Sequence, residues 1–143
     1  MADADAVRSF RDLGVWQKAM ALVVEVYRDA DGFPKSELYG LSSQLRRALV
    51  SIPANIAEGR GRRSTRSFLH FLDIAYGSMA EAQTLLELAT RLGFLPPDRL
   101  AAHVGRLAEI GRMLNSLISA LEQRLHTQPP TGSGLPSSLN PES

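Results

Sequence analysis

The residues of this sequence best suited to binding chemistry are arginines gathered in the middle of the chain. The segment 40–70 holds six arginines against one carboxylate, Glu58, although the whole chain has a net charge of only +1. The six are Arg46, Arg47, Arg60, Arg62, Arg63 and Arg66. A guanidinium group pairs with phosphate oxygens through a planar fork of N–H donors. We therefore interpret these arginines as candidate contacts to a nucleic-acid backbone.

Two features limit this interpretation. Arg46 and Arg47 could instead be solvated, or could pair with acids on a neighbouring subunit. No loop presents aromatic residues among the arginines, since Phe68 and Phe71 belong to a helical core pattern. The sequence therefore does not predict base stacking, which needs an exposed aromatic ring beside the positive charges. Glu58 is four residues before Arg62 and is expected to form a local ion pair with it.

A catalytic or metal site is not predicted. Bundles that bind two metal ions use Glu-x-x-His motifs, but the positions three residues before the histidines hold Ser67, Leu100 and Gln123. The chain has no cysteine, which excludes thiolate metal sites and disulfides. No nucleophile, base and oxyanion-binding group can be assembled from the pattern. We expect a protein that is not an enzyme and uses no cofactor.

A proline interrupts the apolar pattern just before the second group of arginines, in SIPANIAEG at 51–59. Pro53 removes one hydrogen bond from a helix and costs about 3 kcal/mol in a regular one. The helix either bends at Pro53 and continues, or stops near Ser51 and restarts at Pro53. Ile52 and Ile56 keep the apolar residues on one face of the helix before and after Pro53, which favours a kinked, continuous helix. Asn55 is expected to pair with the carbonyl that Pro53 frees. A contact from Asn55 to a nucleotide or substrate is the alternative.

Four helical segments position these residues. Apolar residues recur every three or four positions over about 12–30, 35–59, 64–92 and 97–126, and no segment alternates with a period of two. Short connections between such helices make neighbours antiparallel. The sequence predicts an all-α, antiparallel up-down-up-down four-helix bundle with a kink at Pro53 in the second helix. We expect residues 1–11 to form a flexible N-terminal tail and residues 127–143, rich in Pro, Gly and Ser, to form a disordered C-terminal tail.

The apolar faces of the last two helices are broader than an isolated bundle requires, which indicates self-association or a bulky core with partly exposed leucines. The longest uncharged apolar run, Ala19 to Val24, is far shorter than the roughly 20 residues of a membrane span. The N-terminus lacks the basic and apolar regions of a secretory signal. We expect a cytoplasmic protein without membrane association.

Three separated motifs carry a family resemblance: VWQKAM at 15–20, FPKSELYGLSSQLRRALVSIPANIAEG at 33–59, and FLHFLDIAYGSMAEAQTLLELATRLG at 68–93. Over nearly all of residues 10–122 the chain resembles the bacterial four-helix-bundle proteins first associated with intervening sequences in 23S rRNA genes. It is similar also to the accessory variability protein of diversity-generating retroelements. The resemblance implies a compact bundle that assembles as a homopentameric ring. It also implies a basic surface that binds nucleic acid, and a reverse transcriptase or another protein as partner.

Together these features predict a non-catalytic homo-oligomeric scaffold, a pentamer, whose arginine-rich surface contacts the backbone of RNA or DNA. The resemblance implies that the six arginines correspond to the basic region of that family. Pro53 and Asn55 are interpreted as structural. The alternative is an adaptor that binds only proteins and has no role with nucleic acid.

Overall fold

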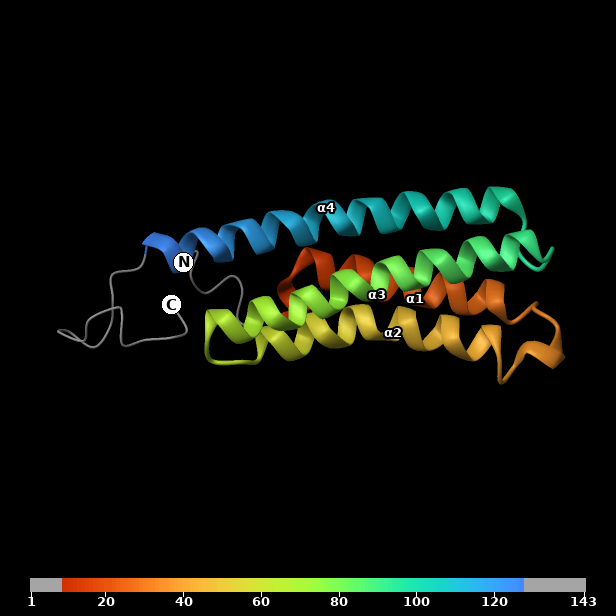
Figure 1. Cartoon of the computed structure of the whole chain (residues 1–143), viewed down its shortest axis with the longest axis horizontal. Coiled ribbons are helices and arrows are strands. Elements are labelled where there is room, and N and C mark those ends of the chain that lie inside the picture. The colour runs from red at the N-terminus through yellow and green to blue at the C-terminus, as the bar shows by residue number, and fades with distance from the viewer. Residues whose placement is uncertain (1–8, 128–143) are drawn as a thin grey trace.

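The computed structural model describes residues 9–127, which form four helices and no strand (Figure 1). The predicted all-α four-helix bundle is confirmed. The helices are α1 (Gly14–Ala30), α2 (Leu41–Arg60), α3 (Thr65–Arg91) and α4 (Pro97–Thr127), with short 3-10 turns at Phe10–Asp12 and Lys35–Glu37. The terminal segments 1–8 and 128–143, which hold most of the two expected tails, lie outside the described residues.

The chain reverses direction at each short connection between helices (Figure 1). The most extensive helix–helix contact is between α2 and α3, and α4 packs against both α1 and α3. The joint between α2 and α3 therefore lies at the same end of the bundle as the C-terminus of α4 (Figure 1). This arrangement decides which arginines can meet.

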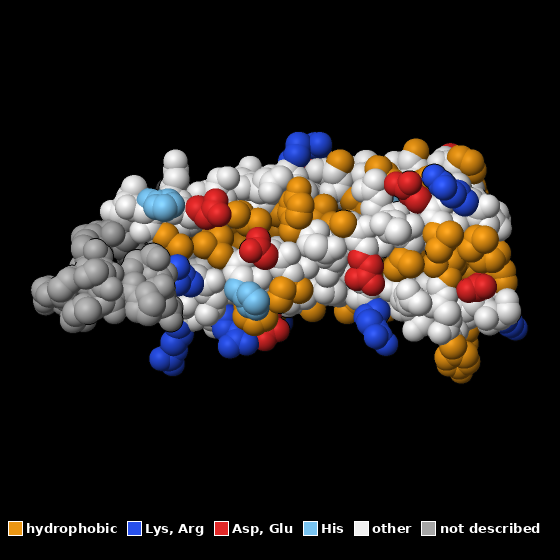
Figure 2. Space-filling model, in the orientation of Figure 1, with side chains coloured by type: hydrophobic (Ala, Val, Ile, Leu, Met, Phe, Trp, Pro, Cys, Tyr) orange, Lys and Arg blue, Asp and Glu red, His pale blue; other side chains and the backbone are white. Residues whose placement is uncertain are grey.

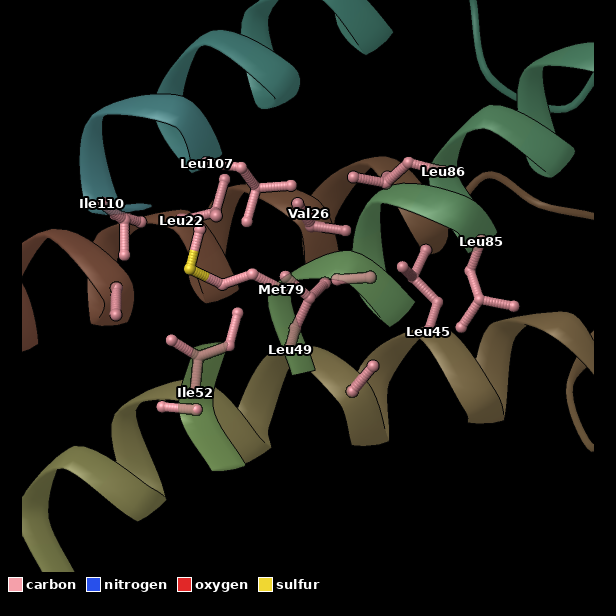
Figure 3. Close-up of a cluster of buried hydrophobic side chains, with 14 of the residues drawn as sticks. Leu22, Val26, Leu45, Leu49, Ile52, Met79, Leu85, Leu86, Leu107 and Ile110 are labelled. Carbon is pink, nitrogen blue, oxygen red and sulfur yellow. The ribbon is translucent and has the colours of Figure 1, made fainter. Parts of the chain in front are cut away.

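A single apolar core holds the four helices together (Figure 3). Burying one Val, Leu or Ile side chain stabilises the fold by about 1.5–3 kcal/mol. Every helix contributes side chains with at most 1% exposure, among them Leu22, Val26, Leu45, Leu49, Ile52, Leu86, Leu107 and Ile110. The apolar residues that recur with a 3.6-residue period in the sequence predict helix faces that turn toward this core.

The first helix ends at Ala30 as expected, but the start of the second helix is shifted. The second helix begins at Leu41 and not near residue 35, because Pro34 is extended (ψ 140°) and Gly40 has non-helical backbone angles. The Glu37 carboxylate accepts a hydrogen bond from the Leu41 N–H at 3.2 Å, which satisfies a donor in the first turn of α2. A glutamate four residues before the helix is not a usual start signal, so the pattern alone placed the start too early.

The N-terminal turn is ordered from Ser9, within the segment expected to be a flexible tail. Asp12 helps to cap the turn before α1, because its carboxylate accepts a hydrogen bond from the Ser9 N–H at 3.3 Å. The Ser9 hydroxyl in turn accepts from the Arg11 N–H at 3.0 Å. Helix α1 starts at Gly14 with no side-chain cap. At the other end, Thr127 belongs to α4 and not to the tail.

Pro53 is buried inside α2, which continues without interruption to Arg60. The alternative in which the helix stops near Ser51 is therefore wrong, and the size of the bend stays a prediction.

Asn55 does not pair with the carbonyl that Pro53 frees, which is that of Leu49. Its amide donates to the Ser51 carbonyl at 2.8 Å and to the Ser51 hydroxyl at 2.9 Å, because a side chain on a helix reaches the residue four positions before it. The Ser51 hydroxyl is also 2.7 Å from that of Ser78 on α3.

Gly59 permits a close approach of α2 to α3 and does not form a left-handed turn. Its position lies inside α2, and Gly61 has a right-handed φ of −78°. A Cβ added at Gly59 would lie 2.9 Å from Phe68 Cδ1 and 2.9 Å from Phe71 Cβ, both on α3. Among the described residues only Gly93, at the end of α3, has a positive φ, of 83°.

Candidate nucleic-acid interface

The six candidate arginines fall into two separate groups. Arg46 and Arg47 lie in the first half of α2, whereas Arg60, Arg62, Arg63 and Arg66 surround the joint between α2 and α3. The fourteen residues from Arg46 to Arg60 span about 21 Å at the helical rise of 1.5 Å per residue. The two groups therefore cannot form one compact patch on a single protomer.

Three arginines of the second group line what we call the arginine groove, at the end of the bundle where α2 joins α3. Arg60, Arg62 and Arg63 are joined there by Arg124 from the last turn of α4, around a groove of about 440 Å³. Figure 2 shows Lys and Arg side chains at this end of the bundle. The remaining lining residues are Leu13, Ser64, Thr65, Phe68, Leu117 and Leu121. Arg66, the second residue of α3, is exposed but does not line the groove.

The expected pair between Glu58 and Arg62 is confirmed. Arg62 Nη2 lies 2.7 Å from Glu58 Oε2, and the Arg62 guanidinium lies 4.7 Å from the Phe71 ring centroid. Both partners of the ion pair are about half exposed, so the pair adds at most about 1 kcal/mol of stability. It does, however, hold the Arg62 side chain over α3.

Four of the candidate arginines have no carboxylate partner within residues 9–127: Arg46, Arg47, Arg63 and Arg66. Several acids are paired elsewhere, on the face between α1 and α4. Lys18 Nζ lies 3.1 Å from Glu109 Oε2, and Arg106 pairs with Glu25. The acids of that face therefore do not neutralise the α2 and α3 arginines, which explains how a chain of net charge +1 keeps locally basic surfaces.

A buried polar cluster on the same α1–α4 face was not evident from the sequence. His103 has no exposed surface, and its Nε2 lies 2.6 Å from Asp29 Oδ2, 74 residues away. The same oxygen accepts from Arg99 Nε at 2.9 Å. Because an ionised carboxylate only accepts hydrogen bonds, Nε2 must be the protonated nitrogen, and Nδ1 has no partner in the described part of the chain. The cluster is closed to solvent at His103 and joins two helices, which is a structural role.

Acid should weaken this cluster. Burial raises the pKa of the Asp29 carboxyl, but hydrogen bonds from His103 and Arg99, together with the Arg99 charge, outweigh burial and hold the pKa below its ordinary 3.8. Asp29 therefore stabilises the fold above pH 3.8, and that contribution is lost as pH falls through the lower folded pKa. We expect the urea midpoint to drop over this range, and to drop less in Asp29→Asn. The exposed Asp31→Asn is the control, and an unchanged drop in Asp29→Asn would contradict the assignment.

The first group of arginines lines a second depression, which we call the tyrosine groove. It has a volume of about 490 Å³, and its residues come from α1, from the turn before α2, and from α2 itself. They are Tyr27, Leu38, Tyr39, Ser43, Arg46, Arg47 and Val50. The Arg46 guanidinium lies 5.1 Å from the Tyr27 ring centroid. The expectation that no aromatic residue lies among the arginines is therefore wrong for this group, because the fold supplies tyrosines from other elements.

The described residues also bear on metal binding and on membrane spans. Within residues 9–127, no three His, Cys, Asp or Glu side chains are placed to hold a metal ion. None of the helices in that range is both long and apolar enough to cross a membrane.

Comparison with known proteins identifies a family and a similar solved structure. The family model described as 23S rRNA-intervening sequence protein matches residues 11–116. A crystal structure of a protein with unknown function from the S23 ribosomal protein family of Bacteroides thetaiotaomicron VPI-5482 is similar, with a TM-score of 0.69 and 25% identity. The match covers 73% of this chain and 95% of that one. No curated protein matches the chain.

Proposed function

This chain belongs to the 23S rRNA-intervening sequence protein family, and we propose that it is a non-catalytic, homo-oligomeric scaffold that contacts the phosphate backbone of a nucleic acid. The observation that carries the proposal is the arginine groove. Arginines from two elements far apart in sequence, the α2–α3 joint and the end of α4, face one depression. Guanidinium groups that converge in this way suit a chain of phosphates.

The groove supports backbone contact and not sequence readout. Its lining contains four arginines and no carboxylate. Its aromatic member, Phe68, is only partly exposed and packs against the core. Contacts to phosphate position a protein on nucleic acid without reading bases. We therefore infer that affinity at this groove depends on charge and salt much more than on sequence.

Self-association is supported by apolar side chains that the single chain leaves uncovered. Ile74 and Leu88 on α3 are 39% and 43% exposed, and Leu92, which follows α3, is 52% exposed. Met20 and Val24 on α1 are 40% and 48% exposed. Helices α1 and α3 are not neighbours in the bundle, so these are two separate sets. Figure 2 shows exposed apolar side chains on the face of the bundle that is in view. Apolar side chains left exposed on a helix suit a protein–protein contact. A pentamer would repeat the arginine groove five times, and repetition raises avidity without new contacts.

The same apolar surface favours the second candidate function, an adaptor that binds only proteins. Mass measurement by light scattering, before and after nuclease treatment, separates the two. The scaffold we propose remains a homo-oligomer after nuclease treatment and regains bound nucleic acid when it is added back. An oligomer that never takes up nucleic acid would favour the adaptor.

Binding should depend steeply on salt. In fluorescence anisotropy with a labelled RNA duplex, we expect the logarithm of the affinity to fall linearly with the logarithm of salt between roughly 50 and 200 mM. Replacing both Arg63 and Arg124 by alanine should weaken binding about tenfold and reduce the slope by about 2, because each arginine neutralises one phosphate. Arg91→Ala with Arg112→Ala removes the same charge away from the groove and should have a smaller effect. Binding that ignores salt, or equal weakening in both double variants, would rule out the groove as the binding surface.

A further inference from the structure

We propose that the tyrosine groove is a second nucleic-acid site, one that stacks an unpaired base of a single strand on Tyr39 while Arg46 and Arg47 contact the adjacent phosphates. This site is distinct from the arginine groove, since Arg46 lies about 21 Å from Arg60 along α2. It would take a different form of the ligand, because a base in a duplex is already stacked and paired.

The first observation is the exposure of Tyr39. Its side chain is 92% exposed, the highest value among the large apolar and aromatic residues that the structure describes as exposed. It stands on the short turn just before α2, where the following Gly40 adds no side chain of its own. An open aromatic ring is a stacking platform for any base, and one such contact commonly strengthens binding of single strands severalfold or more.

The second observation is a positive charge that lines the same groove and is held against Tyr27. The Arg46 guanidinium rests against Tyr27, and its Nε is buried with no hydrogen-bond partner in the described chain. A side chain already fixed by a cation–π contact loses little freedom when it binds an anion. Arg47, the next residue, is exposed and also lines the groove. Two arginines thus line the groove together with its two tyrosines.

The composition of the groove selects its occupant. Besides Ser43, the lining consists of apolar or aromatic side chains and the two arginines, and it contains no Asp or Glu. Its occupant must therefore combine negative charge with a flat, weakly polar surface. A nucleotide of a single strand has both, since each phosphate is joined to a base whose faces are apolar. The volume of about 490 Å³ lies within the range of sites that hold small organic groups.

Three tyrosine variants test the site. With a labelled single-stranded RNA, Tyr39→Ala should lower the affinity about tenfold, while Tyr39→Phe, which keeps the ring, should bind like the wild type. Tyr76→Ala is the matched control, because Tyr76 is an exposed tyrosine on α3, outside this groove. With a duplex of the same length, Tyr39→Ala should bind as tightly as the wild type. A base analogue whose fluorescence is quenched by stacking should report the contact directly in the wild type and not in Tyr39→Ala.

The outcomes are distinguishable from those of the arginine groove. Weaker duplex binding in the Arg63 and Arg124 double variant concerns the proposed function alone. Equal weakening of single-strand and duplex binding in Tyr39→Ala would overturn the stacking site. So would dissociation of the oligomer by Tyr39→Ala, which would make the groove an interface between copies of the chain. Wild-type affinity of Tyr39→Ala for the single strand would also overturn it.

Discussion

Replacing Gly59 by alanine is expected to lower the free energy of unfolding by about 2 kcal/mol. The new methyl group would lie 2.9 Å from the Cβ of Phe71 and 3.2 Å from the carbonyl oxygen of Phe68. These atoms belong to α3 or lie next to its backbone, so a side-chain rotation cannot remove the clash and the two helices must separate. The overpacking penalty, about 3 kcal/mol, exceeds the gain of about 1 kcal/mol that alanine brings to a helix.

Gly61→Ala is the matched control for this prediction. A Cβ at Gly61 would meet only the carbonyl oxygens of Glu58 and Ala57, at 3.5 and 3.6 Å, which are ordinary distances. Its effect should stay within about 0.5 kcal/mol. Urea unfolding followed by circular dichroism at one protein concentration measures both variants, since the stability of an oligomer depends on concentration. Equal stabilities for the two variants would show that α2 and α3 are not closely packed at Gly59.

Replacing Asp29 by alanine should have an effect of similar size, about 2 kcal/mol. The change removes the only hydrogen-bond partner that the described structure provides for the His103 side chain, which has no exposed surface of its own. It also removes the carboxylate that lies 2.9 Å from Arg99 Nε. The ion pair with Arg99 contributes less, because the Arg99 side chain is partly exposed.

Glu109→Ala is the control, because Glu109 also joins α4 to α1 through an ion pair, with Lys18 at 3.1 Å. The side chains of Lys18 and Glu109 are both nearly half exposed, so removing the pair should change the free energy of unfolding by less than about 1 kcal/mol. A double variant, Asp29→Ala with His103→Leu, should recover part of the stability that Asp29→Ala removes, since it eliminates the unpaired donor as well. The interpretation fails if Asp29→Ala is no more harmful than Glu109→Ala.

The helices and their core faces could be predicted because both depend on local periodicity. Leu45, Leu49, Ile52 and Ile56 recur at helical spacing, and all four have no exposed surface. The errors occurred where a side chain from outside the regular pattern determines a boundary. Glu37 satisfies the first turn of α2 from the preceding turn, and no periodic signal marks that bond.

Sequence order determined that Arg60, Arg62 and Arg63 would lie together, because neighbours on a short turn cannot separate. It also determined the all-α class, since apolar residues that recur every three or four positions are compatible with helices and not with strands. Only the tertiary structure decided that Arg124 joins these arginines, that Tyr27 and Tyr39 line one groove with Arg46, and that Asp29 meets His103. Each of these arrangements joins elements whose relative rotation and height depend on how all the helices pack. A periodic pattern specifies which face of a helix turns inward, but not which residues of two helices reach the same height.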